Sequence, residues 1–290
     1  MWIAFTLLAA FAQSWRNALQ SQLSKEVKVA GVTLARFLYA GPLALLYLGT
    51  LHLWRPAPLP QLSLPLTGFI VGAAVMQIVA TGLMVRLFQM KNFSVGAGLA
   101  KTEALMAAIL GTLLFGTPLS ALGWLGVCVG AVAVVLLSGR GHWRQLSGTT
   151  LVIGLACGTA FALTSLWIRE ASLVLPLPFP HRAAWVLVLV IGLQTLLLLG
   201  YLGLRDRPTL MALWQRPKAT FLVSLCSCIG SIGWFSAMAL NAVPYVKTLG
   251  QIEVFFTLAI AALWLKQRVQ LKEAAGLVLI AVAAIIVMWS

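Results

Sequence analysis

Acidic residues are scarce in this chain of 290 residues, which contains 6 Asp and Glu against 20 Lys and Arg. Charged residues account for 9% of the sequence, whereas soluble globular domains carry about 25%. The sequence therefore excludes a soluble globular protein. It also lacks an H-E-x-x-H sequence, a P-loop, a G-x-S-x-G sequence and any aspartate-rich cluster. Because membrane-embedded enzymes and ATP-driven pumps normally contain such motifs, we expect no catalytic residues, no metal and no other cofactor.

Cysteine is also rare, and its placement argues against a zinc site. The four cysteines lie inside apolar segments, at Cys128, Cys157, Cys226 and Cys228. Cys226 and Cys228 do not have the spacing of zinc ligands, and no histidine lies near them in the sequence. We expect free thiols inside the protein, which say little about the redox compartment.

Apolar residues dominate the chain: 61% of its residues are hydrophobic, and the mean hydropathy is +0.99. A helix that crosses a membrane needs about 20 predominantly apolar residues. Ten stretches of this kind can be placed, at 2–22, 29–52, 64–88, 93–115, 119–138, 148–169, 182–203, 218–240, 244–264 and 270–289. We predict an all-α integral membrane protein with ten transmembrane helices.

The first half of the sequence recurs in the second half after a shift of 150 residues. The most telling match pairs Glu103 with Glu253, because acidic residues are so rare in this chain. We predict two five-helix repeats, at 1–140 and 148–290, joined by a short linker at 141–147. An odd number of helices per repeat inverts the second copy in the membrane. Inverted repeats are typical of secondary transporters, which bind substrate near the membrane midplane between the two halves.

The net charge of +14 follows the predicted topology and gives no reason to expect nucleic-acid binding. Loops after odd-numbered helices hold 13 basic residues, namely Lys25, Lys28, Arg86, Lys91, Arg140, Arg144, Arg205, Arg207, Arg216, Lys218, Lys266, Arg268 and Lys272. Loops after even-numbered helices hold 3, namely Arg55, Arg169 and Arg182. The positive-inside rule then predicts an inner-membrane protein with cytoplasmic odd-numbered loops and periplasmic termini.

The first predicted helix has a polar stripe, formed at helical spacing by Gln13, Arg16, Asn17, Gln20 and Ser24. In a membrane, such a face must lie against protein or water. It either lines a substrate cavity or forms hydrogen bonds with neighbouring helices, and Arg16 could instead extend toward the interface. We predict that the first four of these residues bind substrate.

Arg36 and Tyr39 lie well inside the second predicted helix. An arginine within a membrane costs about 2.5–3.5 kcal/mol on insertion scales, so it indicates a function or a buried partner. The Glu103 carboxylate and a substrate anion are the two candidate partners of Arg36. Tyr39 and Trp234 are predicted to form aromatic walls of the cavity, although most Trp residues of a membrane protein lie at the membrane interface.

The fourth and ninth predicted helices carry further polar residues of the interior, at Lys101, Glu103, Lys247, Gln251 and Glu253. Successive residues are about 100° apart on a helix, so Lys101 and Glu103 need separate partners. A carboxyl near the midplane can take up a proton from one side and release it to the other. We predict proton coupling through the two glutamates and substrate binding by the two lysines and Gln251. Alternatively, the glutamates only tie helices together.

The chain resembles the EamA-type ten-helix transporters of the drug/metabolite transporter superfamily. The resemblance rests on AKTEALMAAILGTLLFGTPLS at 100–120 and TLGQIEVFFTLAIAALWLKQRVQ at 248–270, and it covers essentially the whole chain. It implies a central cavity lined by helices one to four and six to nine, alternating access, and export of small metabolites, amino acids or drugs. Members often have Glu before helices five and ten, where this chain has G-T-P at 116–118 and K-Q-R at 266–268. Members usually have cytoplasmic termini, whereas the charge count predicts the opposite.

Within the predicted helices, four basic residues outnumber the two glutamates, which favours an anionic or zwitterionic substrate. We therefore expect a secondary active transporter, an exporter, for a small anionic or zwitterionic metabolite or amino acid. The expected partners are this substrate, the lipid bilayer and a coupling proton, and the protein is expected to be a monomer or homodimer. The main alternative is proton-coupled efflux of hydrophobic cations, which requires both glutamates to be unpaired. A non-transporting scaffold or a lipid-handling enzyme is the alternative from another class.

Overall fold

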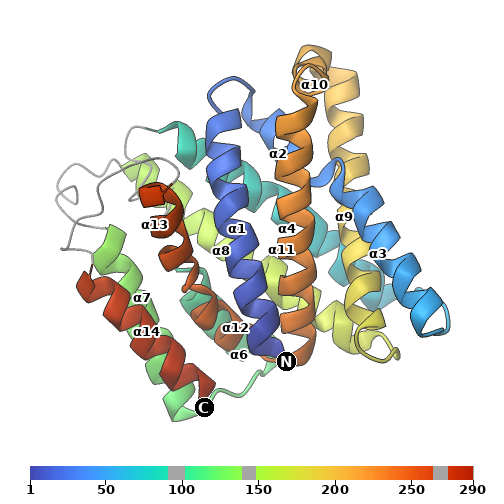
Figure 1. Cartoon of the computed structure of the whole chain (residues 1–290). Helices are drawn as coiled ribbons and strands as arrows, with labels where there is room; N and C mark the ends of the chain where they lie inside the picture. The colour runs from blue at the N-terminus through green and yellow to red at the C-terminus, as the bar shows by residue number, and fades with distance from the viewer. Residues whose placement is uncertain (91–101, 139–147, 264–273, 290) are drawn as a thin grey trace.

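The structure, a computed structural model, describes residues 1–90, 102–138, 148–263 and 274–289 (Figure 1), and every regular element in these ranges is an α-helix. The helices are α1 Trp2–Leu23, α2 Val29–Phe37, α3 Ala40–Trp54, α4 Leu64–Gln89, α6 Glu103–Phe115, α7 Ala121–Ser138, α8 Gly148–Val174, α9 His181–Arg205, α10 Arg207–Trp214, α11 Pro217–Leu240, α12 Val243–Gly250, α13 Glu253–Leu263 and α14 Ala274–Met288. The predicted linker at 141–147 and Lys101 lie outside the described residues.

Several helices have the length and composition of membrane spans. In the part of the chain that the structure describes, five apolar helical segments are long enough, namely Val29–Trp54, Leu64–Gln89, Gly148–Val174, His181–Arg205 and Pro217–Leu240. Large apolar side chains such as Leu46, Leu113 and Leu196 are exposed on the outer surface of the bundle. Such a surface is suited to lipid rather than water. The prediction of an α-helical membrane protein is confirmed at this level.

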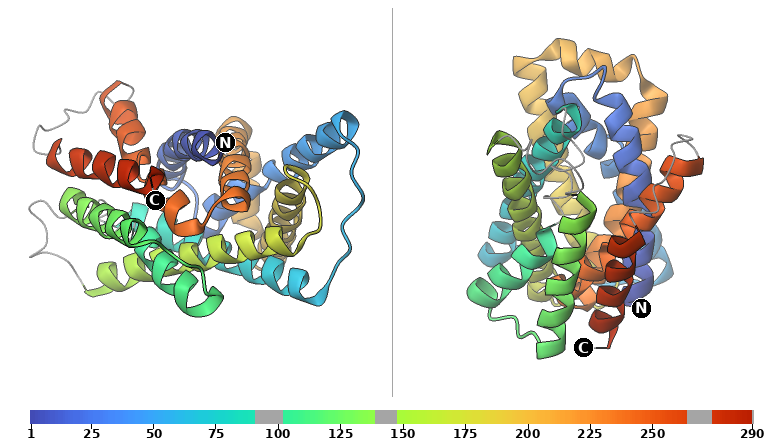
Figure 2. Two further views of the ribbon diagram at one scale, coloured as in Figure 1. Left: turned by 90° about the horizontal axis from the view of Figure 1, so that it is seen from below. Right: turned by 90° about the vertical axis from the view of Figure 1, so that its left-hand side faces the viewer.

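The most extensive helix pairs are three: α1 packs along α11, α4 along α8, and α7 along α14. The α7–α14 pair forms one edge of the molecule in Figure 1 and in the left view of Figure 2, and α3 lies toward the opposite edge. The two ends of the chain lie at the same end of the bundle (Figure 1). The pairs α1–α11 and α4–α8 occupy the middle, so their facing side chains form the interior.

The second predicted helix is divided into α2 and α3 at Leu38–Tyr39. Pro42 has no N–H to donate to the Leu38 carbonyl, which weakens the helix at this point. The hydroxyl of Ser224, on α11, inserts into the same turn: it donates to the Ala35 carbonyl at 2.6 Å and accepts from the Tyr39 N–H at 3.1 Å. A side chain inserted into the backbone ladder is a recognised cause of helix kinks.

The ninth predicted helix, expected as one span at 244–264, is also divided in two. Between α12 and α13 the backbone changes to i→i+3 hydrogen bonds, from Gln251 N to Thr248 O and from Ile252 N to Leu249 O, both at 3.1 Å. Glu253 is the first residue of α13, just as Glu103 is the first residue of α6. Lys247 therefore lies on α12 and Glu253 on α13, so the two side chains can contact different helices.

Helix α10 was not expected from the hydropathy pattern. Asp206 begins it: its carboxylate accepts from the Thr209 N–H and, at 2.8 Å, from the Thr209 hydroxyl, while Pro208 occupies the first turn. Lys28 donates to the same carboxylate at 3.0 Å. The hydrogen bonds from Lys28 and Thr209 hold the pKa of Asp206 below its ordinary value. The D-x-P sequence at 206–208 is a helix-start signal, but the helix that follows is too short to be recognised as a long apolar segment.

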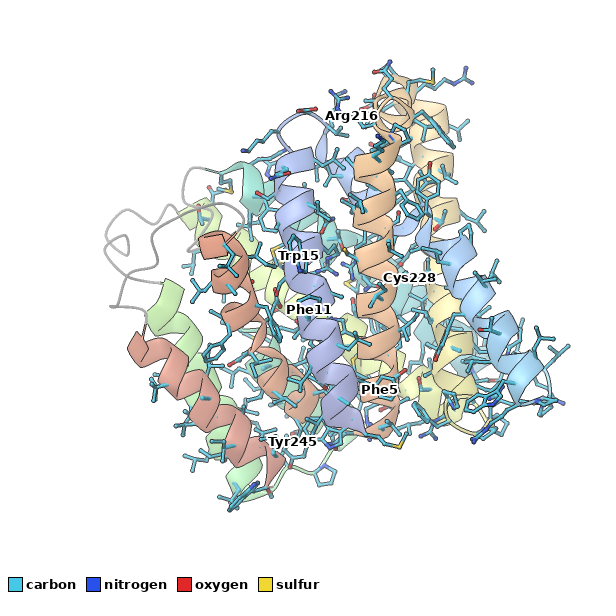
Figure 3. The ribbon with its side chains drawn as sticks, in the orientation of Figure 1. Phe5, Phe11, Trp15, Arg216, Cys228 and Tyr245 are labelled. Carbon is cyan, nitrogen blue, oxygen red and sulfur yellow. The ribbon has the colours of Figure 1, made fainter. Side chains whose placement is uncertain are left out.

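Small residues allow α1 and α11 to come close together. A Cβ placed on Gly233 would lie 2.7 Å from the Phe5 carbonyl oxygen and 2.9 Å from the Ala9 Cβ. Phe5 lies near the lower end of α1 in Figure 3, beside α11. The obstructing atoms belong to the α1 backbone and to a short side chain, so the helix itself would have to shift.

We expect Gly233→Ala to separate α1 from α11 and to lower the melting temperature of the purified protein, because overpacking costs about 1–3 kcal/mol. Gly200→Ala is the matched control, because a Cβ at Gly200 on α9 meets no atom within 4 Å. A Gly233→Ala protein that melts together with wild type and Gly200→Ala would contradict this packing argument.

Candidate functional site: a charged cavity inside the bundle

A cavity lies between the helices of the bundle interior. It is lined by Gln13, Arg16, Asn17, Arg36, Gln77, Met84, Glu103, Phe161, Thr164, Ser165, Ile168, Ser231, Trp234, Phe235, Met238 and Lys247. A second, adjoining cavity is lined by Gln13, Glu103, Ala104, Trp234, Lys247, Gly250, Gln251 and Glu253. The two share Gln13, Glu103, Trp234 and Lys247, so they belong to one site.

The polar face of α1 holds the carboxylate of Glu253. Gln13 Nε2 donates to one carboxylate oxygen at 2.6 Å, and Asn17 Nδ2 donates to the other at 2.8 Å. The Ser14 hydroxyl lies 3.1 Å from the backbone carbonyl of Glu253. The Trp234 indole N–H, in turn, donates to Gln13 Oε1 at 2.9 Å, which fixes the orientation of that amide. The first turn of α13 is thereby attached to the middle of α1.

Glu103 forms an ion pair with Lys247 at 2.8 Å, between α6 and α12. The two side chains are 15% and 10% exposed, so the pair is largely desolvated. Ser165 on α8 donates to the same Glu103 oxygen at 3.0 Å, and the Lys247 ammonium lies 4.2 Å from the centre of the Trp234 ring. In this half of the cavity, the Glu103 carboxylate and the Lys247 ammonium compensate each other's charge.

Arg36 lies in the other half of the cavity and is held by neutral groups. Its Nη1 donates to the Thr81 hydroxyl at 2.6 Å and its Nε to the Ser227 hydroxyl at 3.3 Å. The guanidinium also lies 5.3 Å from the Phe37 ring and 6.0 Å from the Phe161 ring. Although Arg36 is only 3% exposed, no carboxylate of the described residues forms an ion pair with it.

Arg16 is similarly buried, at 4% exposure, and has similarly neutral contacts. Its Nη2 and Nε donate to Asn17 Oδ1, at 2.9 and 3.3 Å. In the described ranges it has no carboxylate within ion-pair distance either. Two buried guanidinium groups that form no ion pair with a carboxylate of the described residues thus border one cavity.

The structure brings most of the predicted site residues together. Gln13, Arg16, Asn17, Arg36, Glu103, Trp234 and Lys247 line the first cavity, and Gln251 and Glu253 line the second one. Gln20 is buried outside the cavity lining, where it donates to the Val32 carbonyl at 3.4 Å. Tyr39 also lies away from it, with its ring packed edge-on against Phe221 at 5.8 Å. Arg36 contacts hydroxyls, so the structure does not show the Arg36–Glu103 pair.

Two polar residues of α4 at the site were not predicted from the sequence. Gln77 lines the cavity, and Thr81, one turn later, holds Arg36. A signal was present: a shift of 150 residues aligns these two positions with Ser227 and Ser231, a polar pair at the same spacing on α11. Comparing positions 150 residues apart for polar character, rather than for identity alone, would have singled out Gln77 and Thr81.

Comparison with known proteins bears on the fold alone. No protein-family model matches this chain, and no curated protein matches it. Among solved structures 27 chains match, and one of them, described as a crystal structure of a protein, has a TM-score of 0.69 at 15% sequence identity. That match covers 98% of this chain and 98% of the other chain. The described part of the chain contains no cluster of three or more His, Cys, Asp or Glu that could hold a metal ion.

We expect Glu103→Gln and Lys247→Met each to lower the melting temperature, because each leaves an uncompensated charge in a largely buried position. Breaking a buried pair costs about 3–5 kcal/mol, whereas replacing both partners can be close to neutral. The double variant should therefore melt closer to wild type than the sum of the single effects predicts. The exposed pair Lys28–Asp206 is the control, where Lys28→Met should change little. Strict additivity of the two cavity substitutions would show that the ion pair contributes nothing.

Proposed function

We propose that this chain is a secondary transporter that moves a small anionic or zwitterionic metabolite or amino acid across the inner membrane by alternating access. The observation that carries the proposal is the pair of buried arginines, Arg16 and Arg36, which border one central cavity without a carboxylate partner among the described residues. A buried charge normally acquires a counter-ion. A negatively charged group of a substrate would supply it here.

An inverted repeat of two five-helix units is part of this proposal, and the helix bounds support it. A shift of 150 residues aligns the first residue of α6, Glu103, with the first residue of α13, Glu253. The same shift aligns α1 with α8 and α4 with α11, so the two extensive pairs α1–α11 and α4–α8 correspond to each other. Both chain ends lie at one end of the bundle, as an even number of crossings requires (Figure 1). We propose membership of the EamA-type transporters on this basis.

Alternating access is supported by where the helices are interrupted. The kink at Leu38–Tyr39 follows Arg36, and the division at Gln251–Ile252 lies between Lys247 and Glu253. Discontinuous helices beside a central site are typical of secondary transporters. A central cavity with buried charges would also serve no purpose in a membrane scaffold.

The charges that line the two cavities favour an anion over a cation. Three basic groups, Arg16, Arg36 and Lys247, face two acidic groups, Glu103 and Glu253. Efflux of hydrophobic cations would require both glutamates to be free for the substrate. Glu103 is paired with Lys247, and both oxygens of Glu253 accept hydrogen bonds from α1. Cation efflux is therefore the less favoured candidate.

The proposed orientation has the termini in the periplasm. In the described residues, Lys25, Lys28, Arg86, Arg207 and Arg216 belong to the end of the bundle opposite to the chain ends, and Arg216 is labelled there in Figure 3. Basic residues concentrate on the cytoplasmic side of membrane proteins. A reporter fused to the C-terminus and active only outside the cytoplasm tests this orientation.

We expect succinate, inorganic phosphate or L-alanine to raise the melting temperature of the detergent-purified protein, and tetraphenylphosphonium to leave it unchanged. A ligand at 100 times its Kd stabilises by about 2.7 kcal/mol. In Arg36→Gln the shift caused by the anionic or zwitterionic probe should disappear, whereas Arg55→Gln, which changes an exposed arginine outside the cavity, should retain it. Stabilisation by the cation alone would refute the proposed substrate class and favour the drug-efflux alternative.

We expect proton coupling to run through Glu103 or Glu253, the carboxylates of the cavity. In proteoliposomes that take up the probe bound by wild type, the Gln variant of the coupling residue should retain exchange and lose acceleration by an imposed proton gradient, because an amide cannot carry the proton. Glu170→Gln on α8, outside the cavity lining, is the matched control. If both cavity variants keep proton-driven uptake, the coupling hypothesis is wrong.

A further inference from the structure

Two glutamine side chains face each other behind the arginine half of the cavity. Gln77 on α4 is 5% exposed and lines the cavity, whereas Gln194 on α9 is fully buried behind it. Gln194 Nε2 donates to Gln77 Oε1 at 2.7 Å and also lies 3.4 Å from the Ala74 carbonyl oxygen. An amide buried in an apolar helix is costly unless it is hydrogen-bonded. Neither glutamine was predicted from the sequence to belong to the site.

The contact with Ala74 determines which way both amides point. A backbone carbonyl has no proton, so the Gln194 atom beside it must be the N–H donor and not the oxygen. The same Nε2 then meets Gln77, whose facing atom must be the acceptor, Oε1. Turning both amides over would place two oxygens against each other at Ala74 and lose that hydrogen bond. Gln77 therefore directs its own Nε2 away from Gln194, on the side where it lines the cavity.

Gln77 borders the same cavity as Arg36, the arginine that forms no ion pair with a carboxylate of the described residues. Thr81, one turn after Gln77 on the same face of α4, accepts from Arg36 Nη1. Arg36 uses Nε and Nη1 for hydroxyl contacts, while its Nη2 donates to no described residue. Gln77 on α4 and Arg36 on α2 thus border the same cavity, and each has an N–H group that donates to no described residue.

We propose that Gln77 is a substrate-binding residue, which donates its amide N–H to the carboxylate or phosphate oxygens held by Arg36, and that Gln194 is the positioning residue that fixes its orientation. This inference rests on the proposed function and specifies how the anionic group is recognised. A ligand group that borders Arg36 and Gln77 meets one guanidinium and one amide N–H donor, so a zwitterion is expected to place its carboxylate at this end.

The test measures the Kd of the detergent-purified full chain for succinate, inorganic phosphate and L-alanine. Their comparison in wild type distinguishes a carboxylate site from a phosphate site. Gln77→Leu should weaken the probe that wild type binds by about tenfold or more, as expected for loss of a hydrogen bond to a charged group. Gln194→Leu should weaken it by less, because the Gln77 amide remains but can rotate.

The double variant distinguishes a positioning role of Gln194 from a merely structural one. In the Gln77→Leu background, Gln194→Leu should have no further effect on Kd, because the orientation of the amide no longer matters. Gln89→Leu is the matched control, the same change on the same helix at a glutamine that donates to the Ser24 carbonyl outside the cavity. It should leave Kd at the wild-type value.

The failures of the two proposals can be told apart. If none of the three probes binds wild type, the proposed substrate class fails and this inference fails with it. If a probe binds wild type and Gln77→Leu binds it equally well, only the role of Gln77 is overturned. If Gln194→Leu and Gln77→Leu have additive effects on Kd, Gln194 does not act through Gln77.

Discussion

The organisation of the bundle depends on keeping two guanidinium groups away from lipid. Arg16 and Arg36 are almost completely buried, and a charge in an apolar environment is unfavourable unless polar groups solvate it. The chain meets this requirement from three helices, because α1 supplies the side-chain amide oxygen Oδ1 of Asn17, and α4 and α11 supply the hydroxyls of Thr81 and Ser227. These helices must therefore turn their polar faces inward. Small residues such as Gly233 then allow α1 and α11 to pack closely enough to enclose the site.

The interruptions of α2–α3 and α12–α13 are compatible with a membrane because protein covers them. Backbone groups that leave the helical ladder need new partners where water is absent. At the first interruption the Ser224 hydroxyl takes the place of the missing contact between Ala35 and Tyr39. At the second interruption, i→i+3 hydrogen bonds replace the i→i+4 hydrogen bonds of the helix around Gln251. Neighbouring side chains consequently reach different helices: Lys247 meets Glu103 on α6, and Glu253 meets α1.

The sequence predicted well what depends on composition and helical spacing. The polar stripe of α1 does converge with Arg36, Glu103 and Lys247, because a membrane leaves polar faces no alternative but the interior. It could not predict which groups pair, since partner choice depends on helix rotation: Lys247 binds Glu103, whereas Gln20 points out of the cavity. The helix division at Gln251 was missed because no proline marks it, and Gln77 was missed because a single amide gives little signal in an apolar helix.

The nature of the partners divides the cavity into two chemically different halves. A carboxylate that binds a lysine both orients and neutralises it, as Glu103 does for Lys247. Hydroxyls and amides orient a guanidinium but leave its charge uncompensated, as Thr81 and Ser227 do for Arg36. A ligand shifts a conformational equilibrium only through a difference in affinity between the states. The Arg36 guanidinium is held in place but not neutralised. Its interaction with an anion can therefore differ between two arrangements of the helices. The arginine half is thus suited to binding the proposed anionic substrate, and the Glu103–Lys247 pair links α6 with α12.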